Sequence, residues 1–101
     1  MAAAAPTTSK KHANFVRESM LRNGKPKSVD ELPGIGPKAK EQLAELGLVH
    51  AHQLLGQLLV CDRDEARYLA FLEVSMPVLR SYPHHYSACF ACLDEWCNLN
   101  L

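Results

Sequence analysis

Apolar side chains recur along this chain at intervals of three and four residues, the spacing that gathers them on one face of an α-helix. The pattern predicts a first helix over about 9–18, with His12 at its surface or cap. Three further helices are predicted over about 50–60, 62–74 and 84–99. Asp62 is the predicted cap of the second of these. No segment alternates with the two-residue period of a strand. The predicted fold class is therefore all-α, a compact domain of five to six helices.

Glycine and proline residues divide the segment 28–47 into two predicted short helices joined by a turn. Ser28 and Glu31 have the spacing of a capping box, which would open a short helix. After the sequence "PGIG", Pro37 fits the first position of a second helix, where its missing N–H costs nothing. Gly47 fits a left-handed cap at the end of that helix. The apolar stripe of the second helix would consist of Ala39, Leu43 and Leu46. This order predicts a helix-hairpin-helix over about 28–47.

Such a hairpin suits the binding of a phosphate backbone. Gly34 and Gly36 allow a tight turn and keep side chains away from a ligand. The unpaired N–H groups at the start of the second helix, at the positive end of its dipole, attract a phosphate oxygen. Lys38 and Lys40 add positive charge beside them. The alternative is that "PGIG" only connects two packed helices, but the cap, proline and lysines in register favour sequence-independent binding of nucleic acid.

The charge is divided between the two halves of the chain. The 101 residues carry a formal net charge of zero. Residues 1–40 hold eight lysines and arginines against three acids, and residues 41–101 hold three against eight. This asymmetry predicts one face for a polyanion and another for a different partner. The length indicates one domain, 9–101, after a disordered N-terminal extension, 1–8.

The cysteines raise the question of a zinc site. Cys89, Cys92 and Cys97 lie near His84 and His85, but the cysteines share one apolar helical side with other core-type residues, and no second CxxC exists. Packing in the core is therefore predicted, with no metal and no cofactor. No nucleophile–base arrangement, paired carboxylates or nucleotide loop is present, so the chain is not expected to be an enzyme.

Several stretches carry a resemblance to a known family. "TTSKKHANFV", "GIG", "LLGQLLV", "RDEARYLAFL" and "CFACLDEWC" occur in the order and approximate spacing of the barrier-to-autointegration factor family. The resemblance implies an all-α homodimer in which each subunit carries one helix-hairpin-helix, so that the dimer bridges two DNA duplexes. It also implies binding to LEM-domain proteins of the nuclear envelope, to lamin and to histones. The implied location is the nucleus, at chromatin and the nuclear envelope, and also the cytoplasm.

The resemblance assigns roles to particular residues. The implied DNA-binding residues are Ser9, Lys10, Lys11, Gly34, Ile35, Gly36, Lys38, Ala39, Lys40, His84 and His85. The implied phosphorylation sites are Thr7, Thr8 and Ser9, and the implied dimer or partner interface comprises Leu48, Leu54, Leu55, Gln57, Leu58 and Phe71. Basic family positions fall on Gln42 and Ser87 in this chain, and there is an insertion around "LRNG". An alternative is therefore an adaptor paralogue with weakened DNA binding, which heterodimerises with or modulates a typical family member.

Overall fold

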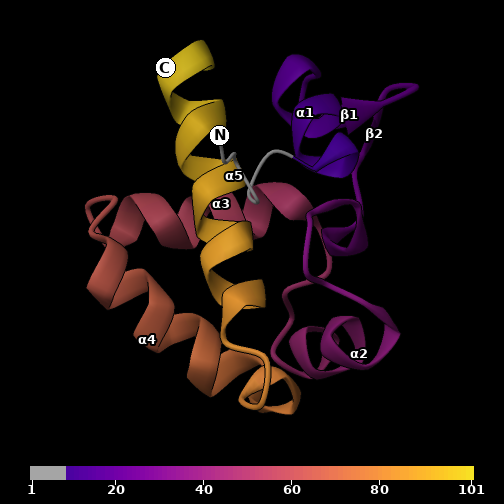
Figure 1. Cartoon of the computed structure of the whole chain (residues 1–101). Helices are drawn as coiled ribbons and strands as arrows, with labels where there is room; N and C mark the ends of the chain where they lie inside the picture. Colours follow the sequence, from indigo (N-terminus) through magenta and orange to yellow (C-terminus); the bar gives the residue numbers. More distant parts are fainter. Residues whose placement is uncertain (1–8) are drawn as a thin grey trace.

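Helix α5, His84–Asn100, runs through the middle of the molecule, and three other helices pack on it (Figure 1). The computed structural model describes residues 9–101. The elements around α5 are α1 (Lys10–Arg17), β1 (Leu21–Arg22), β2 (Lys25–Pro26), the 3₁₀ helix η1 (Val29–Glu31), α2 (Pro37–Glu45), α3 (Ala51–Val60), α4 (Glu65–Ser75) and the 3₁₀ helix η2 (Pro77–Leu79). The predicted all-α fold class is confirmed. In the described part of the chain no helix is both long and apolar enough to cross a membrane.

One apolar core joins all of the helices. Its fully buried side chains include Leu43 of α2, Leu54 of α3, Leu72 of α4 and Leu93 of α5. The predicted stripe of α2 holds for Ala39 and Leu43, but Leu46 is 58% exposed because α2 ends at the residue before it. Gly47 then adopts a φ of +79°, and the Leu48 N–H donates to the Leu43 carbonyl, as the predicted left-handed cap requires.

The cysteines of α5 belong to this core. Cys89, Cys92 and Cys97 are fully buried and reduced, which confirms that they pack as small apolar side chains. Burial raises the pKa of the Cys92 thiol to about 12, with a further contribution from Glu95. The thiols are therefore protonated and unreactive at neutral pH.

A small β-hairpin follows α1 and was not predicted. β1 and β2 pair antiparallel, with Arg22 opposite Lys25. Asn23 and Gly24, the two residues between them, have φ angles of +53° and +79°, the left-handed pair that closes a two-residue hairpin turn. The expectation of a chain without strands is wrong at this place, although the two strands are only two residues long.

The predicted helix caps need two corrections. Ser28 precedes η1, but its side chain makes no capping hydrogen bond, and Glu31 binds Arg22 instead. At α4 the N-cap is Asp64, whose carboxylate accepts from the Arg67 N–H at 2.9 Å. Asp62, the predicted cap, is in a left-handed turn with φ +57° and pairs with the Arg67 side chain. In the first case Arg22 binds the Glu31 carboxylate, and in the second the helix begins later than predicted, with Asp64 as its cap.

Candidate nucleic-acid interface

Three segments that lie far apart in the sequence meet around one hollow of about 350 Å³. They are the start of α1, the glycine turn before α2 and the first turn of α5. The lining residues are Ser9, Lys11, Pro33, Gly34, His84, His85 and Ala88. The structure thus brings together the three groups of residues that the resemblance names as DNA-binding. Pro33 and Ala88 also line the hollow but were not predicted, because neither side chain carries a charge or a polar group that could have marked it in the sequence.

Gly34 holds the turn tightly against α5. Its φ is +87°, in the left-handed region that side chains disfavour. A Cβ atom at this position would lie 2.7 Å from the His85 carbonyl oxygen and 3.1 Å from its Cβ. Both the backbone angle and the close approach therefore require glycine. The predicted tight turn is found at this residue.

Gly36 is different, because nothing among the described residues 9–101 requires it to be glycine. Its φ is −98°, an angle that any residue adopts, and a Cβ would meet no atom within 4 Å. It is the exposed N-cap of α2, and in the part of the chain that the structure describes no side chain caps that helix end. The first N–H groups of α2 therefore face an open space at the positive end of the helix dipole. The prediction that Gly36 serves the tightness of the turn is wrong, but the backbone is as accessible as predicted.

Two of the predicted contact residues lie inside the protein. Ile35 and Ala39 are each only 2% exposed and belong to the core. Their side chains are therefore corrected from ligand contacts to anchors of the turn, and only their backbone atoms can face a ligand. The Ile35 N–H already donates to the Leu32 carbonyl at 3.4 Å, so the Ala39 N–H, in the first turn of α2, is the better donor.

The lysines predicted to bind DNA are not equivalent, and of them only Lys11 lines the hollow. Lys10, Lys11 and Lys38 are exposed, and none of them forms an ion pair within residues 9–101. Lys40 lies 3.3 Å from a carboxylate oxygen of Asp30, which compensates part of its charge. Among these lysines, the positive charge that no carboxylate compensates within residues 9–101 is therefore that of the first three.

The N-terminus of α1 is fixed by two contacts. The Ser9 hydroxyl caps the helix by accepting from the His12 N–H at 3.1 Å. His12 is only 3% exposed, and its Nε2 lies 2.9 Å from Glu95 Oε1 of α5. The expected place of His12 at the surface or cap is therefore wrong, although its spacing from Phe15 and Val16 could have revealed a shared buried face. Thr7 and Thr8 lie outside the described residues.

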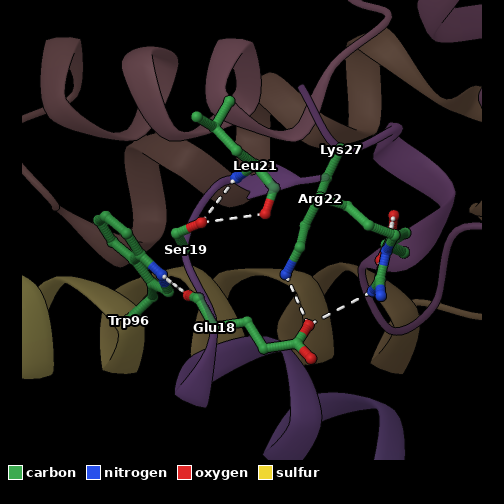
Figure 2. A network of polar contacts seen from close by, with 7 residues as sticks. Glu18, Ser19, Leu21, Arg22, Lys27 and Trp96 are labelled. Carbon is green, nitrogen blue, oxygen red and sulfur yellow. Dashed lines mark hydrogen bonds and ion pairs between the residues drawn. The ribbon is translucent and has the colours of Figure 1, made fainter. Parts of the chain in front are cut away.

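The other end of α1 is joined to the hairpin by a polar network (Figure 2). Glu18 accepts from the buried Lys27 ammonium at 2.8 Å and from Arg22 at 3.3 Å. The Trp96 indole N–H of α5 donates to the Glu18 carbonyl at 2.9 Å. Lys27 also lies 4.9 Å from the centre of the Phe15 ring. These contacts set the position of α1 relative to α5 and so the position of its lysines.

His84 and His85 begin α5 beside the glycine turn. Their ring centroids are 4.2 Å apart, and the Tyr82 ring lies close to both. His84 is exposed and His85 is partly buried. Burial, and secondarily the charge of His84, lower the pKa of His85 below its ordinary value. His85 is therefore largely neutral at pH 7 in the unliganded subunit.

The predicted dimer or partner interface divides into two sets. Leu54 and Leu58 are fully buried in the core of the single subunit, which removes them as surface contacts. Their spacing on α3 indicates an apolar face, but it does not distinguish a face buried in the subunit core from one buried against a partner. The residues of the set that remain partly exposed are Leu48, Leu55, Gln57 and Phe71.

The geometry defines a small helical domain in which a glycine turn, an uncapped helix end and exposed lysines share one surface. Comparison with known proteins identifies its family. The family model described as barrier to autointegration factor matches residues 6–100. Barrier-to-autointegration factor of Drosophila melanogaster is 38% identical over 90 residues, which are 89% of this chain and 92% of that protein. The proteins of Mus musculus and Homo sapiens are each 37% identical over 92 residues, 91% of this chain and 96% of theirs. The chain belongs to the barrier-to-autointegration factor family.

Proposed function

We propose that this protein binds double-stranded DNA without sequence preference through the hollow and the adjoining start of α2. The observation that carries the proposal is Gly36, which is glycine although neither its φ nor its surroundings in the subunit demand it. A glycine at an exposed helix start, where packing within the described residues does not demand it, leaves the backbone open to the close approach of another molecule. The uncapped N–H groups beside it and the exposed lysines indicate that this molecule is an anion.

The binding would rest on phosphate contacts. The N–H groups of Lys38 and Ala39 donate to phosphate oxygens, while the ammonium groups of Lys10, Lys11 and Lys38 supply charge. None of these groups recognises a base edge, so the affinity is independent of sequence. Displaced counterions make the binding fall steeply with salt, by a slope of about −0.9 per neutralised phosphate on logarithmic axes. The helix-hairpin-helix of η1, the turn and α2 is thus assigned as the DNA-binding unit.

The family points to a dimer that bridges two duplexes and organises chromatin. The partly exposed Leu48, Leu55, Gln57 and Phe71 offer apolar surface that a second subunit, or a LEM-domain protein of the nuclear envelope, would cover. We also propose lamin and histones as partners, on the basis of family membership. The corresponding location is the nucleus, at chromatin and its envelope, and the cytoplasm. No catalytic role is proposed.

A second candidate is an adaptor with weakened DNA binding. Lys40 is partly neutralised by Asp30, and Gln42, which stands where the family has a basic residue, accepts from the Val78 N–H at 3.0 Å instead of facing a ligand. These two features reduce the positive charge of α2. Such a protein would form mixed dimers with a typical family member and limit its grip on DNA.

An electrophoretic shift assay with random duplex tests the first candidate. Gly36→Glu places a side chain and a negative charge at the start of α2, and we expect it to abolish the shift while the circular dichroism spectrum stays unchanged. Ala44→Glu is the matched control, because it adds the same charge to an exposed position at the far end of the same helix. Equal binding by wild type and Gly36→Glu would refute the site.

The mass of the particles tests bridging and the adaptor. Sedimentation of the protein should give about twice the subunit mass of 11.2 kDa, and the complex with short duplexes should contain two of them. A monomer at micromolar concentration would refute bridging. If wild type shifts no duplex but forms a mixed dimer with a typical family member, the adaptor is correct and the first candidate is wrong.

A further inference from the structure

Helices α2 and α4 both pack against η2, away from the hairpin that follows α1 (Figure 1). Exposed apolar side chains gather where these three elements meet. These side chains are Leu46, Val74 and Val78, which are 58%, 74% and 37% exposed. A hollow of about 160 Å³ lies between Leu46 and Val74. Val74 is the most exposed of the large apolar side chains of α4, and it lines this hollow together with Leu46. We refer to Glu45, Leu46, Val74 and Val78 together as the α2–α4 surface.

The rim of this surface is acidic. Glu45 lines the hollow, and Glu41 stands one turn earlier on α2; neither forms an ion pair within the described part of the chain. Glu45 is also the last residue of α2, and no basic residue occupies the last turn of that helix. The carbonyl groups at a helix C-terminus add negative potential. The α2–α4 surface therefore repels nucleic acid. It attracts a protein surface on which a positively charged side chain lies beside an apolar one.

The hairpin of residues 21–26 offers that combination. Leu21 is 50% exposed, and Lys25 is exposed and has no ion-pair partner within residues 9–101. The hairpin is held in place rather than loose: the Ser19 hydroxyl donates to the Leu21 carbonyl at 2.9 Å and accepts from the Leu21 N–H at 3.1 Å (Figure 2). Arg22 is tied to Glu18 and Glu31. Its exposed leucine and ammonium are thus presented in a fixed geometry.

We propose that the hairpin of one copy docks on the α2–α4 surface of a second copy. Leu21 would cover Val74 and Leu46, and the Lys25 ammonium would meet Glu45 at the C-terminal end of α2. The argument is the complementarity of the two surfaces in both charge and polarity. Because the two surfaces differ, the contact is head-to-tail and leads to open chains of molecules rather than a closed pair. The hollow that we assign to DNA takes no part in the contact, so the inference does not depend on the proposed function.

Sedimentation velocity of the whole protein without DNA tests this contact. Association beyond the basal species should rise with protein concentration at about 50 mM salt and disappear at about 500 mM, where the screening length is well under 10 Å. Lys25→Glu and Glu45→Lys should each raise the concentration needed for association at least about tenfold. The double variant, Lys25→Glu with Glu45→Lys, restores opposite charges and should associate like wild type.

The control variant is Lys38→Glu, which makes the same charge change as Lys25→Glu but lies at the DNA surface. It should leave association unchanged. A fixed mass at every concentration at low salt would overturn the proposal. So would association that survives both single reversals, or that is lost with Lys38→Glu and kept with Lys25→Glu. Failure of the double variant to recover, although it remains folded by circular dichroism, would likewise refute the assigned contact between Lys25 and Glu45.

Discussion

Substitution of each of the two glycines of the turn by alanine should affect two different quantities, the free energy of unfolding at Gly34 and the affinity for duplex at Gly36. Gly34→Ala introduces a Cβ at a φ of +87°, which costs about 1–2 kcal/mol for a left-handed backbone. The same Cβ lies 2.7 Å from the His85 carbonyl oxygen, a backbone atom that moves only with α5. Overpacking of this kind costs about 1–3 kcal/mol. The free energy of unfolding should therefore fall by about 2–5 kcal/mol.

Gly36→Ala makes the same chemical change two residues later with the opposite expected result. Its φ of −98° suits alanine, and the added Cβ has no neighbour within 4 Å. Alanine is a poorer N-cap than glycine by a fraction of 1 kcal/mol, and its restriction of the unfolded chain returns about 0.4–1 kcal/mol. The free energy of unfolding should stay within about 0.5 kcal/mol of wild type. The affinity for duplex should nevertheless fall at least about tenfold, since in the proposed complex the Cβ would stand where a phosphate approaches.

Thermal unfolding and a duplex titration measure both effects. For a domain of this size 1 kcal/mol moves Tm by about 4–8 °C, so Gly34→Ala should lower Tm by at least about 8 °C and Gly36→Ala should change it by less than about 4 °C. A Gly34→Ala variant that melts like wild type would show that the turn does not press on α5. A Gly36→Ala variant that binds duplex with wild-type affinity would remove the main support for the DNA site.

Two further expectations concern α1. Glu18→Gln should lower Tm more than Lys27→Met. Glu18→Gln leaves the buried Lys27 ammonium without its counterion, whereas Lys27→Met leaves a half-exposed carboxylate that water solvates. The reverse order of the two Tm values would contradict this account. Thr8→Glu with Ser9→Glu, which mimics phosphorylation at two of the implied sites, should weaken duplex binding, because negative charge at position 9 lies beside the hollow that Lys11 also lines and repels a DNA backbone there. Unchanged affinity of that variant in the shift assay would remove the proposed phosphorylation switch.

The helices could be predicted because their signals are local and repeated. The start of α2 at Pro37 and the left-handed cap at Gly47, just beyond its end, follow from the backbone demands of two residues, and both are found as predicted. The hairpin was missed because two-residue strands are too short for a visible alternation, although Asn23 and Gly24 form the dipeptide that favours such a turn. Lys27 could not be predicted as a core residue, since lysine is rarely buried without a partner that only the fold supplies.

The candidate site was predictable in its parts but not in its assembly. The sequence indicates that a turn with two glycines is special, but both glycines look alike until the fold places His85 beside Gly34 and leaves Gly36 open. The same holds for the lysines, because only the fold shows that Lys40 lies against Asp30 while Lys38 does not. Which groups remain available to a ligand is decided by contacts between distant segments, and these have no signature within either segment.

The histidines at the start of α5 lead to a last prediction, on pH. Burial and the charge of His84 lower the pKa of His85 in the unliganded protein, and a nearby phosphate raises it again by favouring the cation. Binding of duplex should therefore take up protons, so the affinity is higher near pH 6 than near pH 8, and the gain is lost as the pH rises through the pKa of the complex. Stability follows the opposite course. Because the pKa is lower in the folded than in the unfolded state, His85 favours the fold above about pH 6.5 and this contribution is lost as the pH falls. His85→Gln should flatten both dependences, measured by duplex titration and by Tm across that range. If wild type and His85→Gln show the same two pH profiles, His85 neither faces the phosphate nor titrates with the fold.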